Sequence, residues 1–517
     1  MKQFIIGTLI ALIGLSSCYE DESTLGTKNI SDITIEGLTD QSVISYIGNK
    51  IEIQPNIKTE YPENELQYAW YLYKESGGEV ENGYKNQLIS NEKNLSYEVN
   101  LPSGTYNIVL EVKSLSNNYT KTSTMKIFVS TDFSKGFYIL KETADGNTEV
   151  DLYNNNRLSS NLMTSIVGSP LKGKPRNISI VYSGEYIDPD KNEAESTNLV
   201  HIFTEDNIYK GFRAEDMKEV FNNSTLFYSG EMEPNEEPYT IFRAPNHTVY
   251  FSNTGIRNAQ TAFGSSGHNT GMLGYPVDTH GTSKFVQPVY RGIYMLYWSN
   301  SEHKLRVIDR NFTPSAEVEY DSSTSYPDDL NCICSGINEV GGVQNVIFIC
   351  ESASTKDRYV LLVDPNNSYK IKKCIKLDPS FHISKSNMIT VNKRTATYIY
   401  CISNNELYAY SWETNDERKF ALPGVDSSET ISYVTNQYFY YKWDLSTNFN
   451  SLIIGTQTGN KYKLYFYNSE NMNGGQPISE GTSIEGEGIL KSVRFLSSLQ
   501  ISGSDHLTTT PIYPLTD

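Results

Sequence analysis

The sequence predicts an all-β protein, in which an Ig-like β-sandwich at the N-terminus is followed by a β-propeller of about seven blades. The apolar stretches are short, alternate with polar residues and are separated by Gly, Asn, Asp and Pro, a pattern typical of strands and turns. From about residue 133 onward, pairs of such stretches recur at intervals of roughly 40 to 65 residues, the size of a propeller blade. Helical periodicity is almost absent, and only Glu215 to Phe221 could form a turn or two of helix.

Residues 30–130 have the strand spacing of a sandwich of about 100 residues. Trp70 stands in the middle of an apolar stretch, where a large aromatic side chain would fill the core. The expected strands are Asp32–Glu36, Lys50–Ile57, Leu66–Lys74, Leu95–Val99, Gly104–Ser114 and Thr120–Val129.

Residues 133–500 are expected to form the propeller, because the repeats contain strands alone and a propeller blade is a four-stranded sheet. A β-helix ranks lower, since it would need shorter and more regular repeats. Each repeat joins two apolar strands through a polar turn. The pairs are Gly136–Lys141 with Glu149–Tyr153, Leu199–Thr204 with Asn207–Gly211, Tyr239–Arg243 with Thr248–Ser252, Gly292–Ser299 with Lys304–Asp309, Val346–Cys350 with Tyr359–Asp364, Ala396–Ser403 with Glu406–Trp412, and Ser451–Thr456 with Lys461–Asn468.

The first residues have the features of a lipoprotein signal peptide. An apolar run from Phe4 to Leu15 follows Lys2 and is shorter than the roughly 20 residues of a membrane span. Leu15, Ser16 and Ser17 form a lipobox before Cys18, whose thiol is expected to carry lipid after cleavage. Since several acyl chains anchor durably, the mature protein is expected to be held on a membrane through Cys18. The alternative is an ordinary signal peptide with a chance cysteine.

An acidic run follows this cysteine directly. Glu20, Asp21 and Glu22 resemble the surface-export signal of Bacteroidota lipoproteins, which implies an outer-membrane anchor facing outside the cell. The alternative is an acidic flexible tether. The expected organisation is therefore a signal peptide at 1–18, a tether at 19–29, the sandwich at 30–130, the propeller at 133–500 and a C-terminal tail at 501–517.

The N-terminal module resembles the PKD domain, an Ig-like fold. Its residues 104–112, Gly-Thr-Tyr-Asn-Ile-Val-Leu-Glu-Val, match the late-strand pattern of that domain, and Tyr-Ala-Trp-Tyr stands at 68–71. The usual Gly-Asp-Gly turn after the tryptophan strand is absent, and Tyr-Leu-Tyr-Lys occupies 71–74 instead.

With the lipobox before it and Gly-Phe-Tyr-Ile-Leu at 136–140 after it, this order of parts resembles the PKD-like family of Bacteroidota lipoproteins. The resemblance implies a role in glycan uptake, beside an outer-membrane importer and its lipoprotein lid. It carries over no catalytic residue.

Composition limits the partners. The formal net charge of −18 argues against nucleic acid, because phosphate binding needs basic patches. The 38 tyrosines suit strands and broad contact surfaces.

The cysteines beyond Cys18 crowd one third of the chain. Cys332 and Cys334 stand two residues apart on an expected strand and should therefore point to one face. Cys350 and Cys401 each end an apolar run and should be buried. The fifth is Cys374, and the spacing suggests neither a disulfide scaffold nor a zinc site, although it leaves individual disulfides open.

Catalytic and metal-binding motifs are lacking from the sequence. The seven histidines form no His-x-x-x-His spacing, and no Gly-x-Ser-x-Gly elbow occurs. Asp188 begins a run like a calcium loop, but Glu193 and Leu199 stand where an EF-hand needs Gly and Glu. No metal or cofactor is therefore expected. A hydrolase would need two spaced carboxylates, and the sequence gives no way to choose a pair.

The glycine-rich segment from Phe263 to Phe285 is the candidate ligand loop. Glycines let a backbone approach a ligand closely, and His268, Tyr275, Asp278 and His280 can bond sugar hydroxyls. The alternative is an ordinary interblade loop. The densest aromatic run, residues 438–443, is expected to pack between blades, with stacking on sugars as the alternative.

These observations favour a noncatalytic surface lipoprotein that serves glycan capture or uptake as a binding or accessory component. Two other functions stay open: a propeller hydrolase or lyase acting on polysaccharide, and a protein scaffold that docks on an outer-membrane importer. Binding, product release and co-purification of partners discriminate the three.

Overall fold

The computed structural model describes residues 31–44, 50–74, 83–85, 87–99, 101, 104–189, 192–230, 232–233, 235–244, 247–260, 270–289, 294–309, 315–321, 325–365, 369–440, 448–473 and 476–499. The chain divides into two compact units. One comprises Met1–Leu101 and Thr105–Val129, and the other comprises Pro102–Gly104 and Ser130–Asp517.

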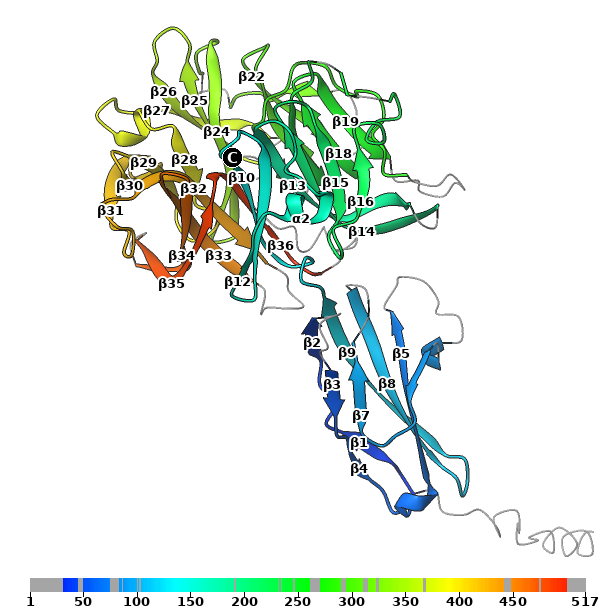
Figure 1. Ribbon diagram of the computed structural model, residues 1–517. Helices are drawn as coiled ribbons and strands as arrows, with labels where there is room; N and C mark the ends of the chain where they lie inside the picture. Colours follow the sequence, from blue (N-terminus) through cyan, green and yellow to red (C-terminus); the bar gives the residue numbers. More distant parts are fainter. Residues whose placement is uncertain are drawn as a thin grey trace, which may run out of the picture. The chain divides into compact units, whose positions relative to one another are not determined.

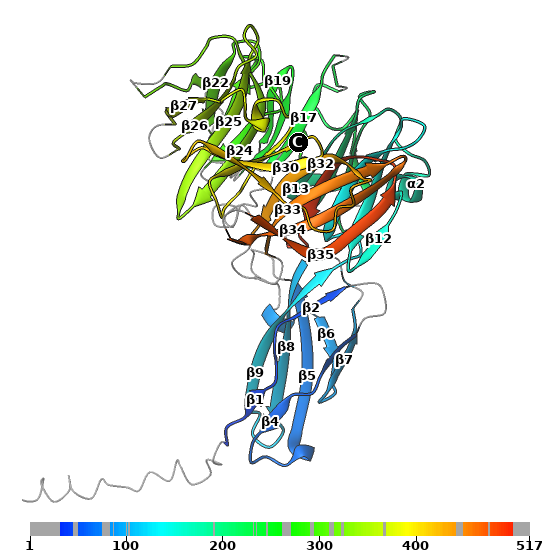
Figure 2. The same cartoon turned by 90° about the vertical axis from the view of Figure 1, so that its left-hand side faces the viewer.

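The N-terminal unit is a β-sandwich (Figure 2). Its largest sheet has the strand order β2-β9-β8-β5-β6, and β3 with β7 and β1 with β4 form two smaller sheets. The strands are β1 (Thr34–Glu36), β2 (Gln41–Ile44), β3 (Lys50–Ile53), β4 (Asn56–Lys58), β5 (Leu66–Lys74), β6 (Gln87–Ser90), β7 (Leu95–Glu98), β8 (Gly104–Ser114) and β9 (Thr120–Ser130), with 3-10 turns η2 (Glu63–Glu65) and η3 (Gly83–Lys85).

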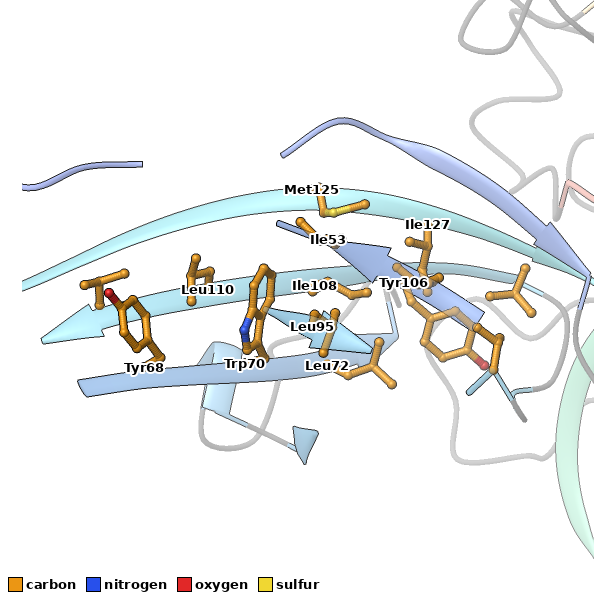
Figure 3. Close-up of a cluster of buried hydrophobic side chains, with 14 of the residues drawn as sticks. Ile53, Tyr68, Trp70, Leu72, Leu95, Tyr106, Ile108, Leu110, Met125 and Ile127 are labelled. Atoms are coloured by element: carbon orange, nitrogen blue, oxygen red, sulfur yellow. The ribbon is translucent and has the colours of Figure 1, made fainter. Parts of the chain in front are cut away.

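Trp70 is the centre of the sandwich core, as its position in the sequence predicts. Its side chain is fully buried, and Figure 3 shows the indole with Leu110 on one side and Ile108 and Leu95 on the other. The indole Nε1 donates a hydrogen bond to the Glu92 carbonyl at 2.9 Å, so the ring fills the core without leaving a buried donor unpaired.

The C-terminal unit is a β-propeller with seven blades among the described residues (Figure 1). Each blade is an antiparallel sheet, six with four strands and one with three. From the inside outward, the blades are β36-β10-β11-β12, β13-β14-β15-β16, β17-β18-β19, β20-β21-β22-β23, β24-β25-β26-β27, β28-β29-β30-β31 and β32-β33-β34-β35.

The strand bounds follow in chain order. They are β10 (Gly136–Glu142), β11 (Thr148–Asn154), β12 (Arg157–Ser159), β13 (Pro175–Asp188), β14 (Glu193–Thr204), β15 (Tyr209–Arg213), β16 (Glu219–Asn222), β17 (Pro238–Arg243), β18 (His247–Ser252), β19 (Gly255–Gln260), β20 (Val286–Val289), β21 (Tyr294–Ser299), β22 (Lys304–Asp309), β23 (Ala316–Glu317), β24 (Leu330–Val340), β25 (Val343–Ser352), β26 (Arg358–Val363), β27 (Ile371–Lys376), β28 (Met388–Val391), β29 (Tyr398–Ser403), β30 (Glu406–Ser411), β31 (Asp416–Phe420), β32 (Thr430–Phe439), β33 (Phe449–Thr458), β34 (Lys461–Asn473), β35 (Gln476–Glu487) and β36 (Ile489–Leu496). Among the described residues, the unit also contains a short helix α2 (Leu162–Val167) and a 3-10 turn η5 (His382–Ser384).

The last strand that the structure describes closes the ring. β36 is the innermost strand of the first blade and pairs antiparallel with β10, from Gly136 opposite Leu496 to Glu142 opposite Ile489. β36 also packs against β13 on one side and β32 on the other. Strands more than 300 residues apart in the sequence are therefore joined in one sheet, which leaves the first and last blades without an open edge between them.

The expected strand pairs all occur, one in each blade. The expectation of a helix at Glu215 to Phe221 was wrong: Glu219–Asn222 is the edge strand β16, preceded by a turn. In β16, Phe221 pairs with Gly211 and is buried, so tertiary packing outweighs a local helical pattern too short to be stable alone.

The expectation that Cys332 and Cys334 share a face was also wrong. A β-bulge between them puts an extra residue on β24, which reverses the alternation of side chains at that point. Cys332 lies in a core with Trp298 and Phe348, whereas Cys334 lies in a different core with Ile349 and Val391. Cys350 and Cys401 are fully buried, as expected.

A buried carboxylate joins the first blade to the seventh. Asp151 on β11 is fully buried and lies 2.7 Å from the Lys141 Nζ, which is almost fully buried as well. The Tyr462 hydroxyl on β34 donates to Asp151 Oδ2 at 2.7 Å, and the Asn161 backbone N–H donates to its Oδ1 at 2.8 Å. Removing this carboxylate would leave the Lys141 cation and the Tyr462 hydroxyl without their partner.

We predict that Asp151→Ala lowers the free energy of unfolding by about 3–5 kcal/mol, because it leaves a buried charge uncompensated. Urea unfolding followed by tryptophan fluorescence and circular dichroism measures the change. The matched control is Asp416→Ala, which breaks an exposed pair with Arg418 and should cost less than about 1 kcal/mol. Equal effects of the two variants would contradict the role assigned to Asp151.

Candidate ligand-binding surface

Two exposed tyrosines mark one place on the propeller. Among the Phe, Tyr and Trp side chains that the structure describes, Tyr228 and Tyr275 alone are exposed, at 61% and 75% of their surface. Other described tyrosines are buried or half-buried, largely in the cores between blades. An exposed aromatic ring leaves apolar surface in water unless a ligand or partner covers it, so two exposed rings together indicate a contact surface.

The chain brings these two tyrosines to the same place. Phe227 and Leu273 form a parallel β-bridge, and the Tyr228 N–H donates to the Leu273 carbonyl at 3.0 Å. Tyr275 follows Leu273 by two residues, so its Cα lies within about 8 Å of that bridge. The Tyr228 hydroxyl and the Thr270 hydroxyl are 2.9 Å apart. We call Tyr228, Tyr275 and Thr270 the tyrosine surface.

Arg257 on β19 braces the tyrosine surface from beneath. Its guanidinium lies over the Phe227 ring, 4.8 Å from the centroid, and its Nη1 donates to the Gly274 carbonyl at 3.3 Å. Phe227 and Gly274 each immediately precede one of the exposed tyrosines. The same buried side chain therefore fixes both segments, and Glu236 lies 3.7 Å from its Nε as a buried counter-ion.

The segment that carries Tyr275 also completes the third blade. Gly274 N–H donates to the Asn258 carbonyl at 2.9 Å, and Ile256 N–H donates to the Asp278 carbonyl at 3.0 Å. These bonds place the segment along the free edge of β19, where the other blades have a fourth strand. Gly271, at φ +71°, passes so close to the Glu185 carbonyl of the second blade that a side chain would collide there.

The structure brings together two of the residues in the expected ligand loop. Asp278 is buried, and its Oδ1 accepts hydrogen bonds from the His280 backbone N–H at 2.9 Å and from the imidazole Nδ1 at 3.0 Å. Burial raises the pKa of Asp278, but hydrogen bonds from Ser315 and His280 outweigh it and lower the pKa below the ordinary value. Asp278 therefore stays ionised and holds the half-exposed His280 ring in place.

The remaining expected residues are placed less fully. His268 lies outside the described residues, as do Leu15, Ser16, Ser17, Cys18, Glu20, Asp21 and Glu22. In the aromatic run, Tyr438 and Phe439 are buried between blades, and residues 441–443 are not described.

Asp188, at the start of the calcium-like run, is buried and lies 2.8 Å from the Arg213 guanidinium. Within the described residues, no group of His, Cys, Asp and Glu side chains is arranged to hold a metal ion. No helix in that part of the chain is long and apolar enough to cross a membrane.

Polar side chains also gather around the propeller axis, where inner strands exchange hydrogen bonds. The Ser179 and Thr240 hydroxyls are 3.3 Å apart, and Gln287 Nε2 donates to the Ser335 hydroxyl at 2.9 Å. Asn436 N–H donates to the Thr390 hydroxyl at 3.0 Å. These bonds join neighbouring blades and satisfy buried polar groups near the axis. The sequence did not predict this structural role for these side chains.

Lys393 is the unusual member of this axial group. It is 2% exposed and directly follows β28 after Asn392. Burial lowers the pKa of Lys393 to about 8, with Cys334 opposing the shift and the nearby Arg494 guanidinium adding to it. A buried cation beside a second cation is a local cost to folding.

Comparison with protein families identifies the N-terminal part of the chain. Residues 18–175 match the model of the PKD-like family. The match spans the described sandwich, hereafter the PKD-like unit, and continues through β10, β11 and β12 to the start of β13. No curated protein matches the chain.

Solved structures similar to the chain are distant. A quinonprotein alcohol dehydrogenase-like protein from Bacteroides thetaiotaomicron is 14% identical, with 88% of this chain and 97% of that chain covered and a TM-score of 0.37. An auxiliary nutrient binding protein from the same organism is 9% identical, with 84% and 83% covered and a TM-score of 0.26. An oligogalacturonate lyase in complex with manganese is 10% identical, with 69% and 95% covered and a TM-score of 0.35. Similarities at this level carry no argument about function, and the propeller assignment rests on the sheet order above.

We predict that Lys393→Met stabilises the protein at pH 7 by about 2–3 kcal/mol, because it removes the cost of charging a buried amine whose pKa is shifted from 10.5 to about 8. Between these two pH values the unfolded chain binds more protons than the folded one, so the lysine's unfavourable contribution shrinks as pH rises. The stability difference between variant and parent should therefore fall toward zero by about pH 10.5.

Urea unfolding of both proteins from pH 7 to 10.5 measures this difference. The control Lys419→Met removes an exposed lysine that pairs with Glu406 and should change stability by less than about 1 kcal/mol at pH 7. A Lys393→Met variant that is less stable than its parent at pH 7 would show that the ammonium has a favourable partner.

Proposed function

We propose that this chain is a noncatalytic lipoprotein that binds glycans, held on the outer membrane through Cys18 and facing outside the cell, as a binding or accessory component of glycan capture or uptake. The observation that carries the binding role is the pair of exposed tyrosines, Tyr228 and Tyr275, on a frame fixed by Arg257.

The chemistry of the tyrosine surface suits a sugar. One face of a pyranose ring presents C–H groups that pack against an aromatic ring, and the hydroxyls around it need hydrogen-bonding partners. Tyr228 and Thr270 supply hydroxyls at the surface, and His280 supplies a half-exposed imidazole that Asp278 holds in place. Arg257 fixes the residues that precede both tyrosines, so the backbone that carries the two rings loses little conformational freedom on binding, which favours affinity.

The anchor in this proposal rests on the sequence before residue 31. Leu15, Ser16, Ser17 and Cys18 supply the lipobox, and Glu20, Asp21 and Glu22 supply the export signal. The PKD-like family match begins at residue 18, directly after the expected cleavage site. Several acyl chains on one cysteine would hold the protein durably on a membrane.

We predict that Tyr228→Ala and Tyr275→Ala each weaken glycan binding by about tenfold or more, corresponding to about 1.4 kcal/mol of lost contact. Affinity electrophoresis and calorimetry of the full chain with a panel of neutral and acidic polysaccharides measure the loss. Tyr228→Phe keeps the ring and should retain most affinity. Arg257→Lys keeps the charge but loses the planar contact with Phe227, and should weaken binding without unfolding the propeller.

The matched control is Tyr73→Ala on the PKD-like unit, a half-buried tyrosine away from the tyrosine surface in sequence. Unchanged binding in both tyrosine-surface variants would refute the site. Release of product from any polysaccharide would instead favour the hydrolase or lyase function, and co-purification with outer-membrane proteins without sugar affinity would favour the scaffold function.

We predict that Cys18→Ser abolishes incorporation of labelled fatty acid and leaves an uncleaved precursor, because the serine hydroxyl does not take the lipid. Replacing Glu20, Asp21 and Glu22 together by Ala should keep the lipid but remove the protein from the cell surface, as measured by proteinase digestion of intact cells. Full surface display of the triple variant would show that the acidic run is only a tether.

A further inference from the structure

Cys332 and Cys350 face each other across the antiparallel pair of β24 and β25. Val340 and Val343 flank the two-residue turn Gly341-Gly342, so they form a hydrogen-bonded pair. Pairs alternate along the ladder, and Cys350 lies seven residues beyond Val343 on the unbulged strand, so its pair with Cys332 is of the non-hydrogen-bonded kind.

The geometry of such a pair suits a disulfide. Directly opposite residues at non-hydrogen-bonded positions have Cα atoms about 4.5 Å apart and side chains close together. That separation lies within the range of about 4.4–6.8 Å found for disulfide-bonded cysteines. The β-bulge matters here, because without the extra residue Ile333 rather than Cys332 would stand opposite Cys350.

The Cys332 and Cys350 thiols lie in one hydrophobic core, and the Cys332 Sγ contacts the Cys334 carbonyl at 3.3 Å. Both side chains are buried in the core that contains Trp298 and Phe348. Burial, followed by the contact with Cys350, raises the pKa of the Cys332 thiol.

The other described cysteines have different neighbours. Cys334 lies opposite Ile349 and donates to the Ile389 carbonyl at 3.5 Å. Cys374 lies opposite Leu361, and Cys401 lies between Ile389 and Tyr408. Within the described strands, Cys332 and Cys350 are thus the one cysteine pair in direct register.

We propose that Cys332 and Cys350 become a cross-strand disulfide when the chain folds in the presence of a disulfide oxidant, which goes beyond the proposed binding function. One thiolate attacks the oxidant's disulfide and releases a thiolate, and the second cysteine then attacks the mixed disulfide and releases another. The two cysteines lose two protons and two electrons, and one oxidant disulfide becomes two thiols. Because the folded core buries both thiols, the bond forms while the fifth blade is assembling.

The test uses the full chain in two samples. One is extracted from the membranes of cells that export it, and the other is reduced, unfolded in urea and refolded by dilution into reduced and oxidised glutathione. Free thiols are blocked with N-ethylmaleimide, and peptides are mapped by mass spectrometry with and without reduction. The expected result is a peptide bridged between Cys332 and Cys350, with Cys334, Cys374 and Cys401 alkylated.

Variants sharpen the result. Cys332→Ser should leave Cys350 alkylated, whereas the control Cys374→Ser should leave the bridge intact. The bridged protein should unfold at a temperature higher by about 5 °C than the Cys332→Ser/Cys350→Ser double variant, since the bond closes a loop in the unfolded chain.

Alkylation of both Cys332 and Cys350 in both samples, with native circular dichroism, would overturn the proposal. A bridge in the refolded sample alone would support the disulfide chemistry and would count against export to an oxidising compartment. Loss of glycan binding has no bearing on either outcome, so the two proposals fail separately.

Discussion

Closure of the propeller ring by β36 is the constraint on which the rest of the C-terminal unit depends. Each blade buries its two faces against its neighbours, so an open ring would expose the core of the first and last blades to water. Pairing β36 with β10 completes a four-stranded first blade from both ends of the chain. The Asp151 carboxylate, bonded to Tyr462 of the seventh blade, adds a buried polar link at the same seam.

Closure has a consequence for the polar groups near the axis. The inner strands are brought side by side, so their backbone and side-chain donors lose water and must find partners in adjacent blades. Ser179 with Thr240 and Gln287 with Ser335 meet this demand. The Lys393 ammonium is less well compensated for its loss of water. Its pKa is lowered because the ammonium is buried beside Arg494. The same geometry that closes the ring therefore stores a local electrostatic cost.

The candidate ligand surface arises where the blade pattern is least regular. Within the described residues the third blade has three strands, and an irregular segment takes the place of the fourth. That substitution leaves Tyr275 exposed while Asp278, three residues on, is buried and anchors His280. Arg257 holds this irregular segment in place, because its guanidinium contacts Phe227 and the Gly274 carbonyl, the residues that precede the two exposed tyrosines. A surface loop positioned by a rigid scaffold is a common basis for recognition.

The sequence by itself determined the all-β class, the sandwich around Trp70 and one strand pair in every blade, because alternation and turn residues are local properties. It also predicted a ligand loop in the segment that contains Tyr275, Asp278 and His280. Only the tertiary structure decided that β36 belongs to the first blade, that Tyr228 joins Tyr275, and that Cys332 rather than Cys334 opposes Cys350. Each of these depends on register or on pairing between distant segments, and a bulge of one residue reverses a face in a way that side-chain periodicity does not reveal.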